Sequence, residues 1–201
     1  MSVTRSGGVG ALLGQVLLAT LPLPAGTTTD RIRSAASGDR AAVQALCKEI
    51  LPRVRNLVRY LVRGDSHVDD AAQEALIAVV RGLPSYRGEG AFTAWVDRIV
   101  ARATFSTLRR MRGKPEEIAV EVEGEAPAIG EAYVLRRQVV AELDRLPPEQ
   151  REALVLHFSV GMTVPEIAEM TGTPFETIRS RIRLGKTALR DALGGRDAQE
   201  P

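Results

Sequence analysis

The sequence is poor in the residue types that most often build catalytic and metal sites. Among its 201 residues are one cysteine, Cys47, and two histidines, His67 and His157. A single cysteine excludes an intrachain disulfide and is typical of a reducing compartment. The two histidines lack the spacing of metal ligands, and no glycine-rich phosphate loop or nucleophile elbow occurs. We therefore predict no catalytic residues, no metal site and no cofactor.

The three side chains in question are expected to have structural roles. Cys47 lies among apolar positions of a predicted helix. We expect its thiol to be buried and inert, and a redox-sensing role is the alternative. His67 and His157 are predicted to be structural or surface residues.

Long hydrophobic runs are also missing. The stretch from Gly7 to Gly26 carries no charge, but Gln15 and two prolines interrupt it, so a membrane-spanning helix is not expected. With Arg5 before it, the stretch resembles a signal peptide, and an exported enzyme is the function that this interpretation would allow. We expect instead that residues 1–29 form a disordered apolar extension or reflect a start codon placed too far upstream. The protein is then cytoplasmic.

No convincing run of β-branched residues alternates at period two with polar residues, which is the pattern of a half-buried strand. Apolar residues recur instead at intervals of three and four, as at Leu46, Ile50 and Val54, which predicts helices. Pro52 is expected to kink or split the helix that contains it. We predict an all-α protein of two small helical domains, residues 30–112 and 131–194, joined by a flexible acidic linker over residues 113–130.

The net charge of +2 conceals a strong segregation of charge along the chain. Residues 98–114 hold six basic residues and no acid, whereas residues 115–131 hold six glutamates and no base. This alternation indicates two basic surfaces separated by an acidic connector, and basic surfaces favour nucleic acid as a partner.

The stretch over residues 163–190 contains two predicted helix starts. Thr163 and Thr173 are each followed three positions later by a glutamate, which is the pattern of a capping box. Gly172, between the two helices, can adopt a left-handed turn without steric cost. A short helix, a tight glycine turn and a second helix make a helix-turn-helix, which is a DNA-binding motif.

The second helix of this motif is predicted to have an apolar and a basic face. At 100° per residue, Ile178, Ile182 and Leu189 fall on the side that would pack on the first helix, with Phe175 near them. The opposite side is rich in arginine, which binds guanine edges in the major groove or grips phosphates. An ordinary solvated helix face is the alternative. The residues that we expect to bind duplex DNA are Thr173, Glu176, Thr177, Arg179, Ser180, Arg183 and Lys186.

The first predicted domain has its own concentration of aromatic and basic residues. Four of the chain's eight aromatic residues lie between positions 86 and 105, and arginines alternate with them. Rings next to cations are typical of sites for single-stranded nucleic acid, where unstacked bases lie on the rings. Phe92 and Trp95 could instead belong to the core. The candidate residues are Tyr86, Arg87, Trp95, Arg98, Arg102, Arg109 and Arg110.

The helix before these residues begins with the polar cluster Asp69, Asp70, Gln73 and Glu74. Acids near a helix N-terminus interact favourably with the helix dipole, which explains part of this cluster. Its continuation to Gln73 and Glu74 favours a protein-docking surface.

In this order, these features resemble the extracytoplasmic-function (ECF) sigma factors of the primary sigma factor family of bacterial RNA polymerase. The resemblance covers residues 30–193. Two blocks carry it, namely DDAAQEALIAVVRGLPSYRGEGAFTAWVDRIVARATFSTLRR (Asp69–Arg110) and LPPEQREALVLHFSVGMTVPEIAEMTGTPFETIRSRIRLGKTAL (Leu146–Leu189).

The resemblance implies that residues 30–112 form sigma region two and residues 131–194 form sigma region four. Region two would bind the beta-prime clamp of core RNA polymerase and open the promoter at its minus-ten element. Region four would read the minus-thirty-five element and touch the beta flap. The implied partners are core RNA polymerase, promoter DNA and an anti-sigma factor. The polymerase-binding residues implied are Asp69, Asp70, Gln73, Glu74 and Ile77.

The predicted function is therefore to direct promoter recognition, DNA melting and transcription initiation at a signal-responsive regulon, by a protein that is not an enzyme. A free-standing helix-turn-helix regulator that binds duplex DNA as a dimer is the alternative. That class needs an oligomerisation surface and has no polymerase-binding helix.

Overall fold

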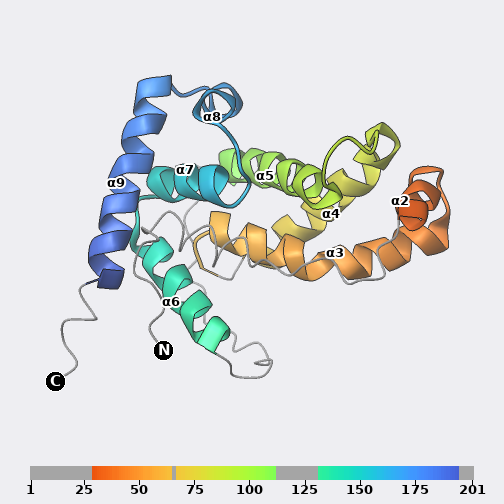
Figure 1. Ribbon diagram of the computed structural model, residues 1–201, viewed down its shortest axis with the longest axis horizontal. Helices are drawn as coiled ribbons and strands as arrows, with labels where there is room; N and C mark the ends of the chain where they lie inside the picture. The colour runs from red at the N-terminus through yellow and green to blue at the C-terminus, as the bar shows by residue number, and fades with distance from the viewer. Residues whose placement is uncertain (1–28, 65–66, 112–130, 195–201) are drawn as a thin grey trace, which may run out of the picture. The chain divides into compact units, whose positions relative to one another are not determined.

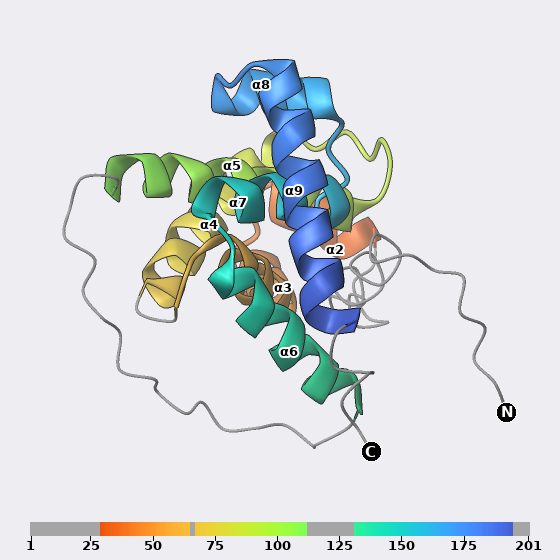
Figure 2. The same cartoon turned by 90° about the vertical axis from the view of Figure 1, so that its left-hand side faces the viewer.

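The structure, a computed structural model, describes residues 29–64, 67–111 and 131–194, and every regular element within these ranges is a helix. The described residues belong to two units, one ending at residue 111 and the other beginning at residue 131. Figure 1 and Figure 2 show the helices of both from two directions. The all-α prediction is confirmed. The predicted acidic linker lies outside the described residues, as does the predicted N-terminal extension except for Thr29, which begins a helix.

The N-terminal unit is built on three helices that pack on one another. Its elements are α2 (Thr29–Ala36), α3 (Arg40–Leu61), α4 (Val68–Gly82), the short 3-10 helix η1 (Leu83–Ser85) and α5 (Phe92–Met111). Helix α2 packs on α3, and α3, α4 and α5 pack pairwise. Small residues on α4, Ala72 and Ala75 among them, are buried and allow its neighbours to approach closely. Helices α4 and α5 run in opposite directions, so that the end of α4 meets the start of α5.

Helix α3 shows how local sequence sets an element. The Asp39 carboxylate accepts the backbone N–H groups of Ala41 at 2.9 Å and Ala42 at 3.2 Å, as an N-cap does. The helix then continues through Pro52, so of the two predicted outcomes, a kink or a split, the split is excluded. Proline removes a single donor from the helical ladder, and the buried side chains of Ile50 and Val54 hold the flanking turns in the core.

The C-terminal unit consists of α6 (Glu131–Arg145), α7 (Pro148–Phe158), α8 (Val164–Thr171) and α9 (Phe175–Gly194). Helix α9 packs on α6, α7 and α8, and α7 also packs on α8. Gly185 allows α9 to lie close to α7, because a Cβ at this position would come within 2.7 Å of Leu154 Cδ1. The fully buried side chains of this core include Val139, Leu143, Leu154, Ile167, Ile178 and Leu189.

Candidate nucleic-acid and polymerase interfaces

Helix α8 begins with the first predicted capping box. The Thr163 hydroxyl accepts the backbone N–H of Glu166, and the Thr163 backbone N–H donates to Glu166 Oε2 at 2.7 Å. The helix ends at Gly172, whose φ of 64° and ψ of 26° are left-handed. The next backbone N–H, that of Thr173, donates to the Ala168 carbonyl at 3.1 Å. The predicted helix-turn-helix is therefore present, with a capped first helix and a glycine turn.

The second predicted capping box is wrong. Helix α9 begins at Phe175, so Thr173 lies one residue before the N-cap position, where its hydroxyl is displaced from the N–H groups of the first turn. The Pro174 carbonyl accepts the backbone N–H groups of Thr177 at 3.0 Å and Ile178 at 3.1 Å, which are the first hydrogen bonds of the helix. The Glu176 carboxylate forms an ion pair with Arg179, with Oε1 and Nη1 3.5 Å apart.

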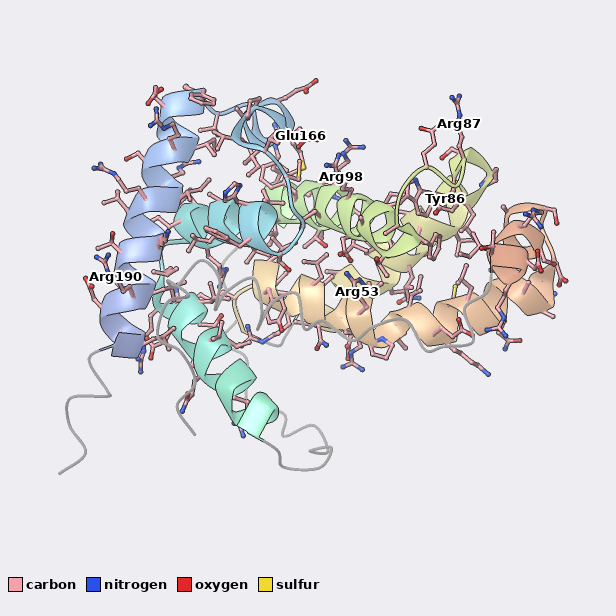
Figure 3. The ribbon with its side chains drawn as sticks, in the orientation of Figure 1. Arg53, Tyr86, Arg87, Arg98, Glu166 and Arg190 are labelled. Carbon is pink, nitrogen blue, oxygen red and sulfur yellow. The ribbon has the colours of Figure 1, made fainter. Side chains whose placement is uncertain are left out.

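The predicted DNA-binding residues of α9 occupy its solvated side. Ile178 and Leu189 are buried, as predicted, and Arg190 projects away from the unit's core on the far part of the helix (Figure 3). Phe175 differs from the prediction, because it is 42% exposed. Thr173 and Ser180 are half-buried, and the exposed residues of the predicted set are Glu176, Thr177, Arg179, Arg183 and Lys186.

Helix α5 presents a basic stripe with one aromatic residue. At 100° per residue, Trp95, Arg98, Arg102 and Arg109 lie within about 60° of one another around the helix. Arg102 and Arg109 are exposed, whereas Trp95 and Arg98 are half-buried. Arg110 lies about 120° from Arg98 around the helix. The structure thus brings four of the predicted residues together on α5 and turns the fifth toward α4.

The loop before α5 is held by an aromatic cluster. The Tyr86 ring lies 5.1 Å from that of Phe92 and 5.2 Å from that of Trp95, measured between centroids. The Tyr86 hydroxyl donates to the Gly90 carbonyl at 3.1 Å and closes the loop, while Arg87 projects away from it (Figure 3). Phe92 is only 6% exposed, so it belongs to the core. Trp95 stacks on it and keeps part of its surface open to solvent.

The predicted polymerase-binding residues form an exposed face on α4. Asp70, Gln73, Glu74 and Ile77 lie within about 100° around the helix, and Ile77 is 44% exposed although it is apolar. Asp69 lies at the edge of this face and forms an ion pair with Arg55 of α3 at 2.8 Å. The structure therefore brings the predicted set together, with one member engaged by a neighbouring helix.

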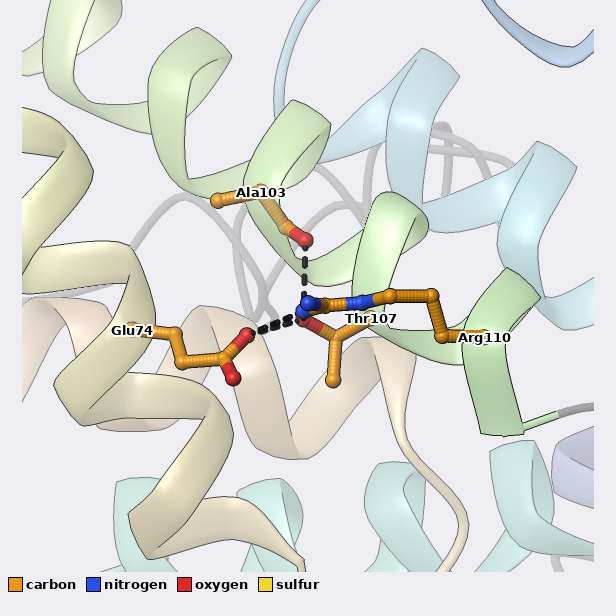
Figure 4. A network of polar contacts seen from close by, with 4 residues as sticks. All are labelled: Glu74, Ala103, Thr107 and Arg110. Carbon is orange, nitrogen blue, oxygen red and sulfur yellow. Dashed lines mark hydrogen bonds and ion pairs between the residues drawn. The ribbon is translucent and has the colours of Figure 1, made fainter.

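A second member of this face is engaged by α5 (Figure 4). Glu74 Oε2 accepts the Thr107 hydroxyl at 2.5 Å and Arg110 Nη2 at 2.6 Å. The hydrogen bond from Thr107 is the main cause that lowers the pKa of the Glu74 carboxyl. Burial opposes this shift, and the charge and hydrogen bond of Arg110 add to the lowering. Thr107 was not predicted. Its position three residues before Arg110 is the only sequence signal, and that spacing alone does not indicate a partner on α4.

The α3–α5 contact contains a buried ion pair that the sequence analysis missed. Arg53 Nε donates to Asp97 Oδ1 at 2.7 Å and its Nη2 donates to Oδ2 at 2.5 Å. Arg53 is 8% exposed and Asp97 5%. Burial raises the pKa of the Asp97 carboxyl, and the hydrogen bonds and charge of Arg53 oppose this shift. Figure 3 shows the Arg53 side chain leaving α3. The pair fixes α5, and hence its basic stripe, on the scaffold.

Cys47 and His157, two of the side chains that could take part in catalysis or metal binding, lie in surroundings that indicate structural roles. Cys47 is half-buried, and burial raises the pKa of its thiol. His157 Nδ1 lies 2.9 Å from the Met162 carbonyl oxygen at the end of α7. In the part of the chain that the structure describes, no cluster of histidine, cysteine and acidic residues could hold a metal ion. None of the described helices combines the length and apolar character needed to cross a membrane.

Comparison with known proteins identifies both units. Residues 46–114 match the family Sigma-70 region 2, and residues 136–189 match Sigma-70, region 4. The ECF RNA polymerase sigma factor SigM of Mycobacterium tuberculosis is 30% identical over 161 residues, which span 79% of this chain and 80% of SigM. The chain belongs to the ECF sigma factors. As a sigma factor, it directs transcription initiation.

A second sequence relative agrees with this assignment, and a solved structure shares the fold. The ECF RNA polymerase sigma-E factor of Escherichia coli K12 is 32% identical over 167 residues, covering 76% of this sigma factor and 86% of sigma-E. Among solved structures, the fold resembles the sigma factor RpoE of Bartonella quintana, solved in complex with the anti-sigma factor NepR. The TM-score is 0.52, with 21% identity over 75% of this chain and 96% of that one. The alternative, a free-standing helix-turn-helix regulator, is not favoured, because the N-terminal unit matches a sigma region as well.

Proposed function

We propose that the two units divide the work of promoter recognition. Residues 30–112 act as sigma region two, binding core RNA polymerase through α4 and the minus-ten element through α5 and its preceding loop. Residues 131–194 act as sigma region four, with α9 binding the minus-thirty-five element as duplex DNA. Residues 113–130 connect the two.

The observation that carries this proposal is that α4 and α5, packed side by side, expose opposite chemistry. Helix α4 exposes Asp70, Gln73 and the apolar Ile77, which suits a protein surface with basic and apolar patches. Helix α5 exposes arginines beside a half-buried Trp95, which suits the backbone and unstacked bases of a single strand. One compact scaffold thus offers two adjacent surfaces for two different partners.

Region four supplies the duplex contact in this proposal. Arg179 and Arg183 lie one turn apart on the exposed side of α9, a spacing that allows both to reach base edges or phosphates in one major groove. Each contact alone is weak, but tethering two DNA-binding units on polymerase raises the effective concentration of the second once the first has bound.

The other partners follow from the family. The Bartonella quintana sigma factor was solved with an anti-sigma factor, and we propose that a protein of that class restrains this chain until a signal arrives. The protein then acts in the cytoplasm on a signal-responsive regulon. It contributes no catalytic group, because RNA synthesis is the chemistry of the polymerase.

Reconstituted transcription tests the proposal. Full-length protein is combined with core RNA polymerase, and run-off transcripts are measured on candidate promoters, including the one upstream of its own gene. We expect transcripts that depend on the protein. If the protein fails to bind core enzyme and yet binds palindromic duplex DNA alone, a free-standing regulator is the better description.

A charge-matched pair of variants locates the polymerase surface. Asp70→Asn and Asp30→Asn each remove one exposed carboxylate from the N-terminal unit, but only Asp70 lies on the proposed α4 face. We expect Asp70→Asn to weaken affinity for core polymerase about tenfold, which corresponds to about 1.4 kcal/mol, and Asp30→Asn to leave it unchanged. Equal affinities for the two variants would remove α4 from the interface.

A further inference from the structure

Glu74 and Arg110 belong to surfaces that the proposed function assigns to different partners, yet they bind each other. Glu74 lies on the α4 face for polymerase, and Arg110 was predicted to bind the minus-ten strand. Their closest atoms, Glu74 Oε2 and Arg110 Nη2, are 2.6 Å apart. Arg110 lies about 120° around α5 from Arg98, and its pair with Glu74 holds the guanidinium at α4, away from the stripe that faces nucleic acid in this proposal.

Thr107 completes the contact. Its hydroxyl donates to Glu74 Oε2 at 2.5 Å and accepts Arg110 Nη2 at 3.0 Å. The Ala103 carbonyl lies 3.2 Å from the same hydroxyl, but the shorter distance and the ionised acceptor favour Glu74 for its single proton. The hydroxyl therefore joins carboxylate and guanidinium into one unit, as Figure 4 shows.

The contact is well suited to exchange. The side chains of Arg110 and Glu74 are 64% and 50% exposed, and exposed ion pairs add little net stability. In the same unit, the side chains of Arg53 and Asp97 are 10% and 8% exposed, so this ion pair is part of the core. A new partner for either member of the exposed pair can therefore displace the other without unfolding the helix pair.

We propose that Glu74 and Thr107 are positioning residues that hold Arg110 away from nucleic acid in the free protein, and that polymerase docking on α4 releases it. The proposal rests on the proposed function. A cationic polymerase group that pairs with Glu74 removes the internal competitor for Arg110. The guanidinium is then available to a phosphate of the promoter strand. By thermodynamic linkage, a phosphate on Arg110 favours polymerase at Glu74 to the same extent.

The free protein provides the first test. Binding of full-length protein to a fluorescent single-stranded oligonucleotide is measured by anisotropy over a range of salt concentrations. Glu74→Gln should bind more tightly, because Arg110 gains a phosphate. One added contact steepens the slope of log K against log salt by about 0.7, which is about fivefold in affinity at 0.1 M salt.

Two controls separate release of Arg110 from a general change of charge. Asp30→Asn removes the same charge from the exposed Asp30–Arg33 pair on α2 and should leave the salt slope unchanged. In the double variant Glu74→Gln/Arg110→Ala the gain should disappear. Unchanged affinity in Glu74→Gln, or a gain that survives in the double variant, would overturn the proposal.

Thr107 is tested with variants that keep every charge. Thr107→Val removes the hydroxyl at nearly constant volume, and Thr107→Ser keeps it. We expect tighter oligonucleotide binding for Thr107→Val and wild-type binding for Thr107→Ser, with circular dichroism showing that both are folded. Equal binding by the two variants would overturn the role of Thr107. Because both variants keep Glu74, this comparison can be made even if Glu74→Gln folds poorly.

The last arm uses polymerase holoenzyme at saturating core enzyme. Wild type and Glu74→Gln should now bind the non-template minus-ten strand equally, because polymerase has already released Arg110 in the wild type. A persistent advantage of Glu74→Gln would overturn release by polymerase. If wild-type protein forms no holoenzyme, the proposed function fails, whereas the measurements on free protein still decide whether Glu74 restrains Arg110.

Discussion

The two units differ in how far apart in the sequence their ion-paired residues lie. In the N-terminal unit, ion pairs join helices that are distant in sequence: Arg53 and Asp97 are 44 positions apart, and Glu74 and Arg110 are 36 apart. In the C-terminal unit, Arg151 of α7 pairs with Asp144 of α6, only seven positions away, and the pairs Arg145–Glu142 and Arg179–Glu176 each lie within one helical turn. The proposed polymerase and minus-ten surfaces therefore share an ion pair, Glu74–Arg110, whereas the helix-turn-helix presents a basic face that local structure already defines.

This difference bears on how each surface binds. On α9, Arg179 forms an exposed ion pair with Glu176 within one helical turn. Binding of a ligand to this helix therefore requires little rearrangement. A ligand of the α4–α5 pair that uses Glu74 or Arg110 meets groups that are already paired with each other, so it replaces one of them. Such exchange makes binding at one surface sensitive to binding at the other, and the effect is reciprocal.

The largest expected effect comes from breaking the buried pair of the N-terminal unit. Asp97→Ala deprives the buried Arg53 guanidinium of its bidentate acceptor and should destabilise the unit by about 3–5 kcal/mol. Trp95, the single tryptophan of the chain, lies in this unit, so urea unfolding followed by its fluorescence measures the destabilisation. The double variant Arg53→Met/Asp97→Leu should recover most of the stability. An exposed ion pair contributes less than about 1 kcal/mol. A destabilisation below that value would show that the Arg53–Asp97 pair contributes no more than an exposed pair.

An intermediate effect is expected on α9. Arg179→Ala or Arg183→Ala should reduce discrimination between upstream promoter sequences by about 1–3 kcal/mol for each base that the arginine no longer reaches. Holoenzyme binding to competing promoters measures this discrimination. Arg190→Ala, an exposed arginine farther along the same helix, is the matched control and should leave discrimination intact. If all three variants discriminate like wild type, the helix face is only a solvated surface.

The smallest expected effect compares the two predicted capping boxes. Thr163→Ala removes a box that the structure contains and should destabilise the C-terminal unit by about 1 kcal/mol. Thr173→Ala removes a threonine outside the cap position and should stay within about 0.5 kcal/mol of wild type. Thermal unfolding followed by circular dichroism gives both values. Equal destabilisation by the two variants would mean that the Thr173 hydroxyl caps α9 in solution.

Much of the fold was predictable because a helix is determined largely by residues that are close in the sequence. The spacing of Leu46, Ile50 and Val54 predicted α3, and all three are buried. The turn at Gly172 was predicted from the freedom of glycine at positive φ, and its φ is 64°. Errors arose where packing against a neighbouring helix decides the outcome. Helix α9 begins after Pro174, and its first residue, Phe175, is exposed, whereas Ile178 and Leu189 of the same helix are buried.

The residues of the candidate site were also predictable in part. Periodicity placed Asp70, Gln73 and Ile77 on one face of α4, and it placed Arg98, Arg102 and Arg109 on one face of α5. It could not show that Arg110 turns to Glu74 or that Thr107 joins them, because neither periodicity nor spacing carries the register between two packed helices.

The sequence by itself determined the helices, their exposed and buried faces, the glycine turn and the family, since each rests on neighbours within a few positions or on short motifs. Tertiary structure alone decided which charges meet: Arg53 with Asp97, Arg55 with Asp69, and Glu74 with Arg110. The physical reason is that an ion pair depends on the distance between atoms, and that distance is fixed only when the packed core sets how one helix lies against another.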